Sequence, residues 1–139
     1  MDNSDDQANL EFRLGNLSQP VRLVFFTQTF GCDSCFQARR LVDQLASLSE
    51  QVTVEEYNLI LDKEKVEEFG VDRAPAIVVM GDKNSGIRYY GLPSGYEVAS
   101  LIEAVSLVGT GDVGLSQSSL NTIKKISCDV DIKVFVTPT

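Results

Sequence analysis

Two thiols stand three positions apart in the segment Cys32-Asp33-Ser34-Cys35. The segment follows the apolar run 21–26 and opens a stretch with helical periodicity, so we expect it between a strand and a helix. The unpaired N–H groups and the macrodipole at a helix start favour a thiolate. In such settings the pKa of a cysteine falls from about 8.5 into the range of about 3.5–7.5. The spacing therefore indicates reversible disulfide chemistry, with a nucleophilic thiolate at neutral pH.

Two other roles for the pair are compatible with the motif taken alone. A structural zinc ion is held by four Cys or His ligands, whereas the chain has three cysteines and no histidine. Only a zinc site bridging two chains stays open, and we predict no metal within one chain. The other alternative is a pair of buried structural cysteines. The third cysteine, Cys128, lies at a predicted helix end before a strand, and we expect it to be a small buried residue.

Composition narrows the classes of protein and of partner. A chain of 139 residues can bury about two-thirds of its unfolded surface without disulfide staples. The sparse, odd cysteine count favours intracellular thiol chemistry, and we predict a cytoplasmic protein. A net charge of −8 disfavours nucleic acid as a partner. No apolar run approaches the roughly 20 residues of a membrane span, and the acidic N-terminus lacks the features of a signal peptide.

The first half of the chain predicts an alternation of helices and strands. Leucines within 5–14 predict a short helix that ends at Gly15, and the apolar segment 21–27 predicts a central buried strand. Apolar positions at helical spacing, Phe36 among them, extend a helix from the cysteines to Ser49. Residues 52–59 alternate as a strand. Together these elements predict a parallel strand, helix, strand unit.

The rest of the chain predicts two further groups of elements. A short helix from Asp62 to Phe69 precedes Arg73-Ala74-Pro75-Ala76, which leads into a strand at 77–80, a turn, a returning strand at 87–90 and a helix at 95–108. Three glycines within 109–114 predict a linker. Beyond it we expect a helix at 115–126 and a strand at 131–137.

This order of elements resembles the thioredoxin fold over residues 20–108. The resemblance implies an α/β protein, a three-layer α/β/α sandwich with a central mixed sheet and here an extra N-terminal helix. The segments 88–97 and 132–139 resemble the glutaredoxin-like protein disulfide oxidoreductases, which consist of two tandem thioredoxin units. We therefore expect a thioredoxin-like unit at 1–109 and the start of a second, truncated unit at 110–139. A fragment of a longer protein is expected, with the tail packed on the first unit or paired at its sheet edge.

The resemblance also implies roles for the residues of the dithiol motif. Cys32 is the attacking nucleophile and Cys35 the thiol that resolves the mixed disulfide. Asp33 and Ser34 tune the redox potential, since a carboxylate beside the thiolate raises the pKa of Cys32. A potential near that of thioredoxin, about −270 mV, is expected. The redox-active disulfide is the only redox group implied, and no bound cofactor is expected.

Four residues outside the motif are expected to bind substrate. The Ala74-Pro75 peptide bond corresponds to a cis bond that faces the dithiol in the thioredoxin fold. A cis bond there leaves the N–H and C=O of Ala74 free to pair with an incoming peptide. Phe30 and Gly31, just before the motif, are predicted to line a hydrophobic collar for a substrate polypeptide. The alternative for Phe30 is an exposed aromatic residue of the loop or a core contact.

The motif's surroundings differ from those of thioredoxins proper. These proteins carry a buried acid six positions before the first cysteine, where this chain has Phe26, and the usual tryptophan is absent. The proton acceptor for Cys35 is therefore water or Glu56.

The resemblance predicts a thiol-disulfide oxidoreductase that acts on protein disulfides and takes part in cell redox homeostasis. Its electrons would come from a thioredoxin-reductase-like flavoprotein or from glutathione. Two alternatives stay open: a non-catalytic peptide-binding or partner-binding module, and an electron-delivery unit for a peroxiredoxin.

Overall fold

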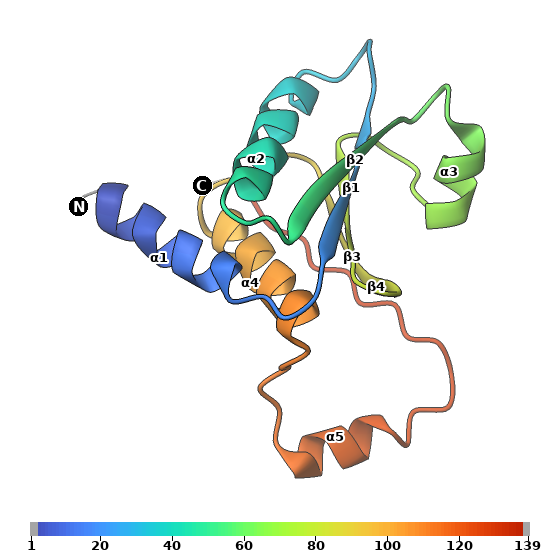
Figure 1. Ribbon diagram of the computed structural model, residues 1–139. Helices are drawn as coiled ribbons and strands as arrows, with labels where there is room; N and C mark the ends of the chain where they lie inside the picture. The colour runs from blue at the N-terminus through green and yellow to red at the C-terminus, as the bar shows by residue number, and fades with distance from the viewer. Residues whose placement is uncertain (1–2, 138–139) are drawn as a thin grey trace.

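Four strands form one mixed sheet in the order β2-β1-β3-β4 (Figure 1). The computed structural model describes residues 3–137, with side chains from residue 8 onward. The central strand β1 (Val21–Thr27) is parallel to β2 (Val52–Asn58) and antiparallel to β3 (Ala76–Met80). The edge strand β4 (Asn84–Tyr90) is antiparallel to β3. The sheet is therefore mixed, as the sequence predicted.

Helices cover both faces of this sheet and make three layers. One face carries α2 (Cys35–Ser47) and α4 (Tyr96–Thr110), and α1 (Asn3–Gly15) packs against α4. The other face carries α3 (Lys63–Phe69) (Figure 1). The predicted α/β/α sandwich with an additional N-terminal helix is confirmed.

The strand β1 is apolar on both faces because both faces contact helices. Leu23 and Phe25 point into the core under α2 and α4, whereas Val24 and Phe26 point into the core under α3. All four side chains are fully buried. Burying such side chains stabilises the fold by about 1.5–3 kcal/mol each. Because both of its faces are buried, β1 lies at the centre of the sheet. The loop that carries the cysteines follows its C-terminal end.

The helix α2 buries one narrow stripe of small and aliphatic side chains. The stripe consists of Cys35, Ala38, Val42 and Leu45, which recur every three or four residues. Phe36 lies about 100° from Cys35, the nearest member of this row, and is exposed, so the expectation that it belongs to the apolar side of the helix was wrong.

The short helix α3 begins and ends as predicted. Asp62 occupies its N-cap position, and Gly70 follows its last residue with φ +63°, a left-handed conformation that glycine adopts freely. Arg88 on β4 reaches the far end of this helix and donates hydrogen bonds to the carbonyls of Phe69 and Gly70. The end of α3 is thereby attached to the edge strand of the sheet.

The predicted linker begins later than expected. The helix α4 runs through Thr110 and ends at Gly111, so Gly109 belongs to the helix. Gly109 is buried, and its carbonyl accepts hydrogen bonds from the backbone N–H groups of Ser18 and Gln19. A side chain at Gly109 would meet Leu17 at 2.6 Å, which explains why a glycine stands there.

Residues 112–137, here called the tail, contain a helix but no strand. The helix α5 (Gln117–Ile123) is shorter than predicted, and the strand expected at 131–137 is absent. Among the described residues, the hydrogen bonds of 113–137 stay within the tail. A strand needs a hydrogen-bonded neighbour, and this segment has none, so apolar alternation alone did not produce one.

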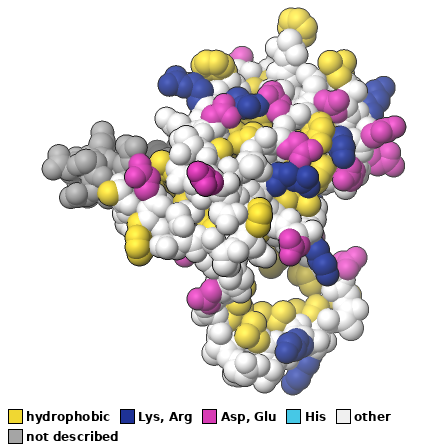
Figure 2. Space-filling model, in the orientation of Figure 1, with side chains coloured by type: hydrophobic (Ala, Val, Ile, Leu, Met, Phe, Trp, Pro, Cys, Tyr) yellow, Lys and Arg dark blue, Asp and Glu magenta, His cyan; other side chains and the backbone are white. Residues whose placement is uncertain are grey.

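The tail, which includes α5, makes a wide loop, and hydrophobic side chains line the inner side of this loop (Figure 2). Cys128 is exposed in this loop, so the expectation that it is buried was wrong. Within residues 3–137, none of the helices has the length and apolar character needed to cross a membrane.

Candidate active site at the dithiol edge of the sheet

Cys32 and Cys35 form a disulfide, with their Cα atoms 5.5 Å apart. The loop that follows β1 carries Cys32, Ser34 occupies the N-cap position, and Cys35 is the first residue of α2. Cys32 thus lies in the turn before the helix rather than within it. Cys32 is half-buried, whereas Cys35 is only 5% exposed. An incoming disulfide can therefore reach Cys32 more easily than Cys35.

The Ala74-Pro75 peptide bond is cis, as predicted. Because β3 is antiparallel to β1, and Ala76 lies opposite Phe26, the residues just before β3 lie beside the C-terminal end of β1. We call this end of the sheet the dithiol edge. The sheet topology thus brings Ala74 and Pro75 to the edge that carries the cysteines. Pro75 is buried, and its carbonyl accepts a 2.9 Å hydrogen bond from the N–H of Gly91. The part of the chain that the structure describes makes no hydrogen bond to Ala74.

The loop before the motif presents an aromatic ring to solvent. Phe30 is 84% exposed, and the side-chain amide of Gln28 donates a hydrogen bond to its carbonyl. Gly31 has φ +72°, a backbone conformation that other residues rarely adopt. Asp33 is exposed between the two cysteines. The fixed turn therefore projects Phe30 outward beside Cys32.

Further apolar side chains at this edge were not predicted. Because β2 is parallel to β1, its end reaches the same edge, and the next turn exposes Ile60 and Leu61. Asn58 shapes that turn, since its side-chain oxygen accepts hydrogen bonds from the N–H groups of both residues. The sequence signal was a run of three apolar residues, 59–61, between two turn-forming residues, Asn58 and Asp62.

These exposed side chains come from segments at the end of the sheet that also carries the dithiol. We call Phe30, Phe36, Ile60 and Leu61 the apolar rim. Figure 2 shows hydrophobic side chains projecting along the upper edge of the molecule, where Figure 1 places the loop between β1 and α2. Scattered exposed apolar residues are ordinary, but several gathered at one edge indicate an interaction surface.

An arginine and a carboxylate stand directly before Ala74. Arg73 donates two hydrogen bonds to Asp72 and lies over the ring of Tyr90, 5.2 Å from its centre. The hydrogen bond from Arg73, followed by its charge, lowers the pKa of Asp72. The contact of Arg73 with the Tyr90 ring, together with the ion pair between Arg73 and Asp72, holds the loop before Ala74 against the end of β4.

The position of the acid in thioredoxins proper is filled by an aromatic cluster. Phe26 is fully buried, with its ring 5.7 Å from that of Tyr57 and 5.9 Å from that of Phe69. Glu56, one of the two expected proton acceptors for Cys35, forms an ion pair with Arg39 of α2. Among the residues described, none of the buried ones is charged or polar.

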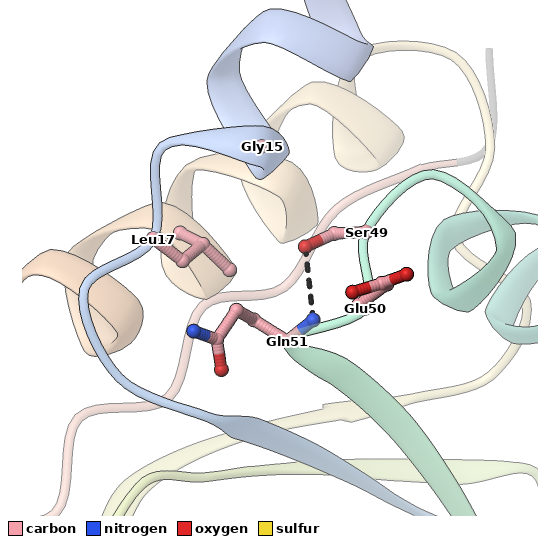
Figure 3. A pocket seen from close by; sticks show the side chains of 5 residues that line it. All are labelled: Gly15, Leu17, Ser49, Glu50 and Gln51. Atoms are coloured by element: carbon pink, nitrogen blue, oxygen red, sulfur yellow. Dashed lines mark hydrogen bonds between the residues drawn. The ribbon is translucent and has the colours of Figure 1, made fainter.

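A hollow of about 530 Å³ lies at the opposite end of the sheet (Figure 3). It is lined by Gly15, Leu17, Ser49, Glu50 and Gln51, next to the paired starts of β1 and β2. In Figure 3 the hydroxyl of Ser49 accepts a hydrogen bond from the N–H of Gln51. This hollow is separate from the dithiol edge. The described residues include no group of three or more His, Cys, Asp or Glu side chains arranged to hold a metal ion.

Comparison with known proteins supports the resemblance seen in the sequence. No protein-family model matches the chain. The chain is 28% identical over 134 residues to an NADH dehydrogenase of Bacillus subtilis, which covers 95% of this chain and 24% of that protein. It is 30% identical over 86 residues to a thioredoxin of Methanocaldococcus jannaschii, which covers 61% of this chain and 92% of that protein.

Two solved structures share the fold. A protein disulfide oxidoreductase from Aeropyrum pernix superposes with a TM-score of 0.78 at 23% identity, over 90% of this chain and 56% of that one. The NTD_N/C domain of alkylhydroperoxide reductase AhpF from Enterococcus faecalis gives a TM-score of 0.79 at 25% identity, over 88% of this chain and 60% of that one.

This chain thus spans about a quarter of the Bacillus subtilis relative and less than two-thirds of either structure. Nearly the whole of the Methanocaldococcus jannaschii thioredoxin, in contrast, aligns with it. The fold and the disulfide support thiol-disulfide oxidoreductase chemistry in general. The chain belongs to the thioredoxin family.

Proposed function

We propose that the chain is a thiol-disulfide oxidoreductase that reduces protein disulfides, with Cys32 as nucleophile and Cys35 as resolving thiol. The observation that carries the proposal is the unequal exposure of the two bonded cysteines at the sheet edge that also holds cis Pro75. The structure holds the oxidised state, which is the product of the reaction proposed here.

The reaction begins from the reduced protein. The Cys32 thiolate attacks one sulfur of the substrate disulfide, the substrate S–S bond breaks, and the departing sulfur takes a proton. The Cys35 thiolate then attacks the Cys32 sulfur of the mixed disulfide and releases the second substrate thiol. Two electrons pass to the substrate, and the Cys32–Cys35 disulfide forms. The proton of Cys35 goes to water, because Glu56 is paired with Arg39.

Substrate binding is assigned to the groups around the dithiol. A substrate segment pairs with the N–H and C=O of Ala74 as an added strand, beside Pro75. The apolar rim, together with Gly31, covers apolar side chains that flank the substrate cysteine. Asp33 and Ser34, which separate the two cysteines, tune the potential of the couple.

Regeneration of the dithiol requires a donor of two electrons. We infer that an NADH-oxidising flavoprotein supplies them, and this inference is supported by the relatives named NADH dehydrogenase and by the AhpF neighbour. Glutathione is the competing donor. A reducing cytosol, where we place the protein, would keep the dithiol available.

Insulin reduction with dithiothreitol tests the proposed reaction. Wild-type protein should accelerate precipitation of the insulin chains, Cys32→Ser should not, and Cys35→Ser should accumulate a mixed disulfide that dithiothreitol releases. Cys128→Ser is the matched control, since this exposed thiol is outside the site and should retain activity. Wild-type protein no faster than Cys32→Ser would support a non-catalytic binding module instead.

A second candidate is electron delivery to a peroxiredoxin. The observation that favours it is the likeness to a domain of an alkylhydroperoxide reductase at a TM-score of 0.79. Peroxide consumption by a peroxiredoxin and a flavoprotein reductase only when this chain is added, and not when Cys32→Ser is added, would favour it. Turnover at the same rate without the chain would exclude it.

We also propose that residues 110–139 begin a second thioredoxin-like unit. The proposal is supported by the exposed apolar side chains of α5 and the tail, which include Ile123, Ile132 and Val134. A longer chain that includes such a unit should protect these residues from hydrogen exchange. Equal exchange in the short and long chains would count against it.

A further inference from the structure

A groove of about 400 Å³ separates the start of α4 from the end of the tail. Its two walls come from segments almost forty residues apart in the sequence. Figure 1 shows the tail crossing back from α5 toward the start of α4. The groove is lined by Ser94, Tyr96, Glu97, Phe135, Val136 and Thr137.

The groove borders the edge of the sheet that holds Pro75. Tyr90, the last residue of β4, pairs with Ala76, and the N–H of Gly91 binds the carbonyl of Pro75 at 2.9 Å. Only a short loop then separates Gly91 from the groove wall at Ser94. On the tail side, Lys133 lies close enough to Asp72 for its charge to contribute to the low pKa of that carboxyl. The wall at the start of α4 therefore follows closely on the residues that bind Pro75, and the tail forms the other side of the same groove.

The lining suits an apolar group. Tyr96 is 89% exposed and Phe135 is 90% exposed, so the two walls each offer an aromatic ring whose surface is still in contact with water. Glu97 is the only charged residue among the six that line the groove, and a lone carboxylate disfavours an anionic ligand. A chain in extended conformation advances about 3.3 Å per residue, so a peptide paired with Ala74 can reach the groove within a few residues.

We propose that this groove binds an aromatic or long aliphatic side chain of the polypeptide substrate, a few residues from the cysteine that Cys32 attacks. The inference rests on the proposed function and adds a specificity subsite, with Phe135 of the tail as one wall and Tyr96 of α4 as the other. The polypeptide is favoured as occupant because Ser94 of the groove wall is only three residues from Gly91, which is hydrogen-bonded to Pro75. The substrate class is therefore a protein disulfide with an apolar residue near one cysteine.

The wall formed by the tail can be changed without disturbing the sheet. Among the described residues, those from 113 to 137 make no hydrogen bond to the first 111 residues, and Phe135 is outside both core clusters. Phe135→Ser is thus a substitution in the groove alone. Phe12→Ser, which removes an exposed ring from α1 outside the groove, is its matched control.

The test uses pre-reduced protein in single turnover with a peptide series. Each peptide carries one cysteine linked to a chromogenic aryl thiol, and a single phenylalanine is moved from two to six residues on either side of that cysteine. A peptide with serine at every variable position is the reference. The readout is the rate ratio of each phenylalanine peptide to the serine peptide. Wild-type protein and Phe12→Ser should prefer phenylalanine about tenfold or more at one position, as expected for burial of one large apolar side chain.

The groove variants decide the outcome. Phe135→Ser and Tyr96→Ser should each bring that ratio close to one. A ratio near one for the wild type at every position, or an unchanged preference in Phe135→Ser, would overturn the subsite. Release of the aryl thiol from the serine peptide by wild-type protein but not by Cys32→Ser shows that the chemistry itself operates. Failure of the groove is thereby separated from failure of the proposed function.

Discussion

The guanidinium of Arg88 donates a 2.7 Å hydrogen bond to the carbonyl of Phe69, across 19 residues of sequence. The same nitrogen also bonds to the carbonyl of Gly70 at 3.1 Å. The last carbonyls of a helix have no partner within the helix, so a side chain from β4 satisfies the end of α3. Through this contact the edge strand also positions the chain that leads from α3 to Pro75.

Replacing Arg88 should therefore destabilise the fold. Arg88→Met keeps much of the aliphatic stem but leaves the carbonyls of Phe69 and Gly70 without their donor, at a cost of about 1–3 kcal/mol in the free energy of unfolding. Urea denaturation measures this change. Arg40→Met, on the exposed side of α2, is the control and should change stability by less than about 0.5 kcal/mol. Equal stability of the two variants would contradict the role of Arg88.

Gly109 is expected to tolerate no side chain. A Cβ atom there would lie 2.6 Å from Cδ2 of the buried Leu17, and overpacking of this kind costs about 1–3 kcal/mol. Thermal unfolding of Gly109→Ala should show the loss. Gly15→Ala, at the end of α1 with no atom within 4 Å of the new methyl group, should be neutral or slightly stabilising. A loss in Gly15→Ala as large as that in Gly109→Ala would refute the packing argument.

Tyr57 should titrate at unusually high pH. Its hydroxyl donates a hydrogen bond to Glu55, and this bond, together with desolvation and the carboxylate charge, raises the pKa of Tyr57 above its ordinary value of about 10. The stabilisation that accompanies this shift is complete below the unfolded pKa and disappears as pH rises through the folded pKa.

Absorbance at 295 nm follows the titration of Tyr57, and its signal is isolated by comparison with Tyr57→Phe. Glu55→Gln should lower the pKa of Tyr57 toward 10, whereas Glu50→Gln at the other end of the sheet should leave it raised. The same pKa in wild type and Glu55→Gln would mean that the carboxylate is not the cause.

Asp33 should hold the dithiol toward the reducing end of the redox scale. A carboxylate beside Cys32 opposes the thiolate and so disfavours the reduced form. We expect a potential near −270 mV for the wild type and a rise of a few tens of millivolts in Asp33→Asn, since 30 mV corresponds to about 1.4 kcal/mol, or one pKa unit.

Equilibration with glutathione buffers measures both potentials. Asp82→Asn, in the hairpin at the opposite end of β3, is the control and should match the wild type. A wild-type potential above roughly −180 mV, or no rise in Asp33→Asn, would be inconsistent with this role.

The sheet and its helices could be predicted because their signals are local. The segment 21–26 is apolar at almost every position, and only a strand buried on both faces accommodates this pattern. Gly70 predicted the end of α3, because glycine readily adopts the left-handed conformation that commonly follows a helix. The cis bond at Pro75 was predicted from the resemblance in fold and not from the X-Pro pair itself, because X-Pro bonds are cis in only about one case in twenty.

The predictions that were wrong concern residues whose burial or strand pairing depends on residues far away in the sequence. Phe36 is an apolar residue of a kind common in cores, but its position on α2 places it on the exposed side of the helix, in the apolar rim. Residues 131–137 alternate like a strand, yet pairing requires a second strand that sequence pattern cannot supply. The groove between Tyr96 and Phe135 was not foreseeable, because it depends on where the tail returns relative to α4.

The contact of Gly109 with Ser18 and Gln19 bears on the timing of folding during synthesis. The dithiol, β1 and all of its strand partners lie within residues 21–80, but α1 packs against α4, which ends at Thr110. Ribosomes add about 5–20 residues per second. The helix α1 must therefore wait several seconds after its own synthesis, with its buried side exposed, until α4 emerges from the ribosome.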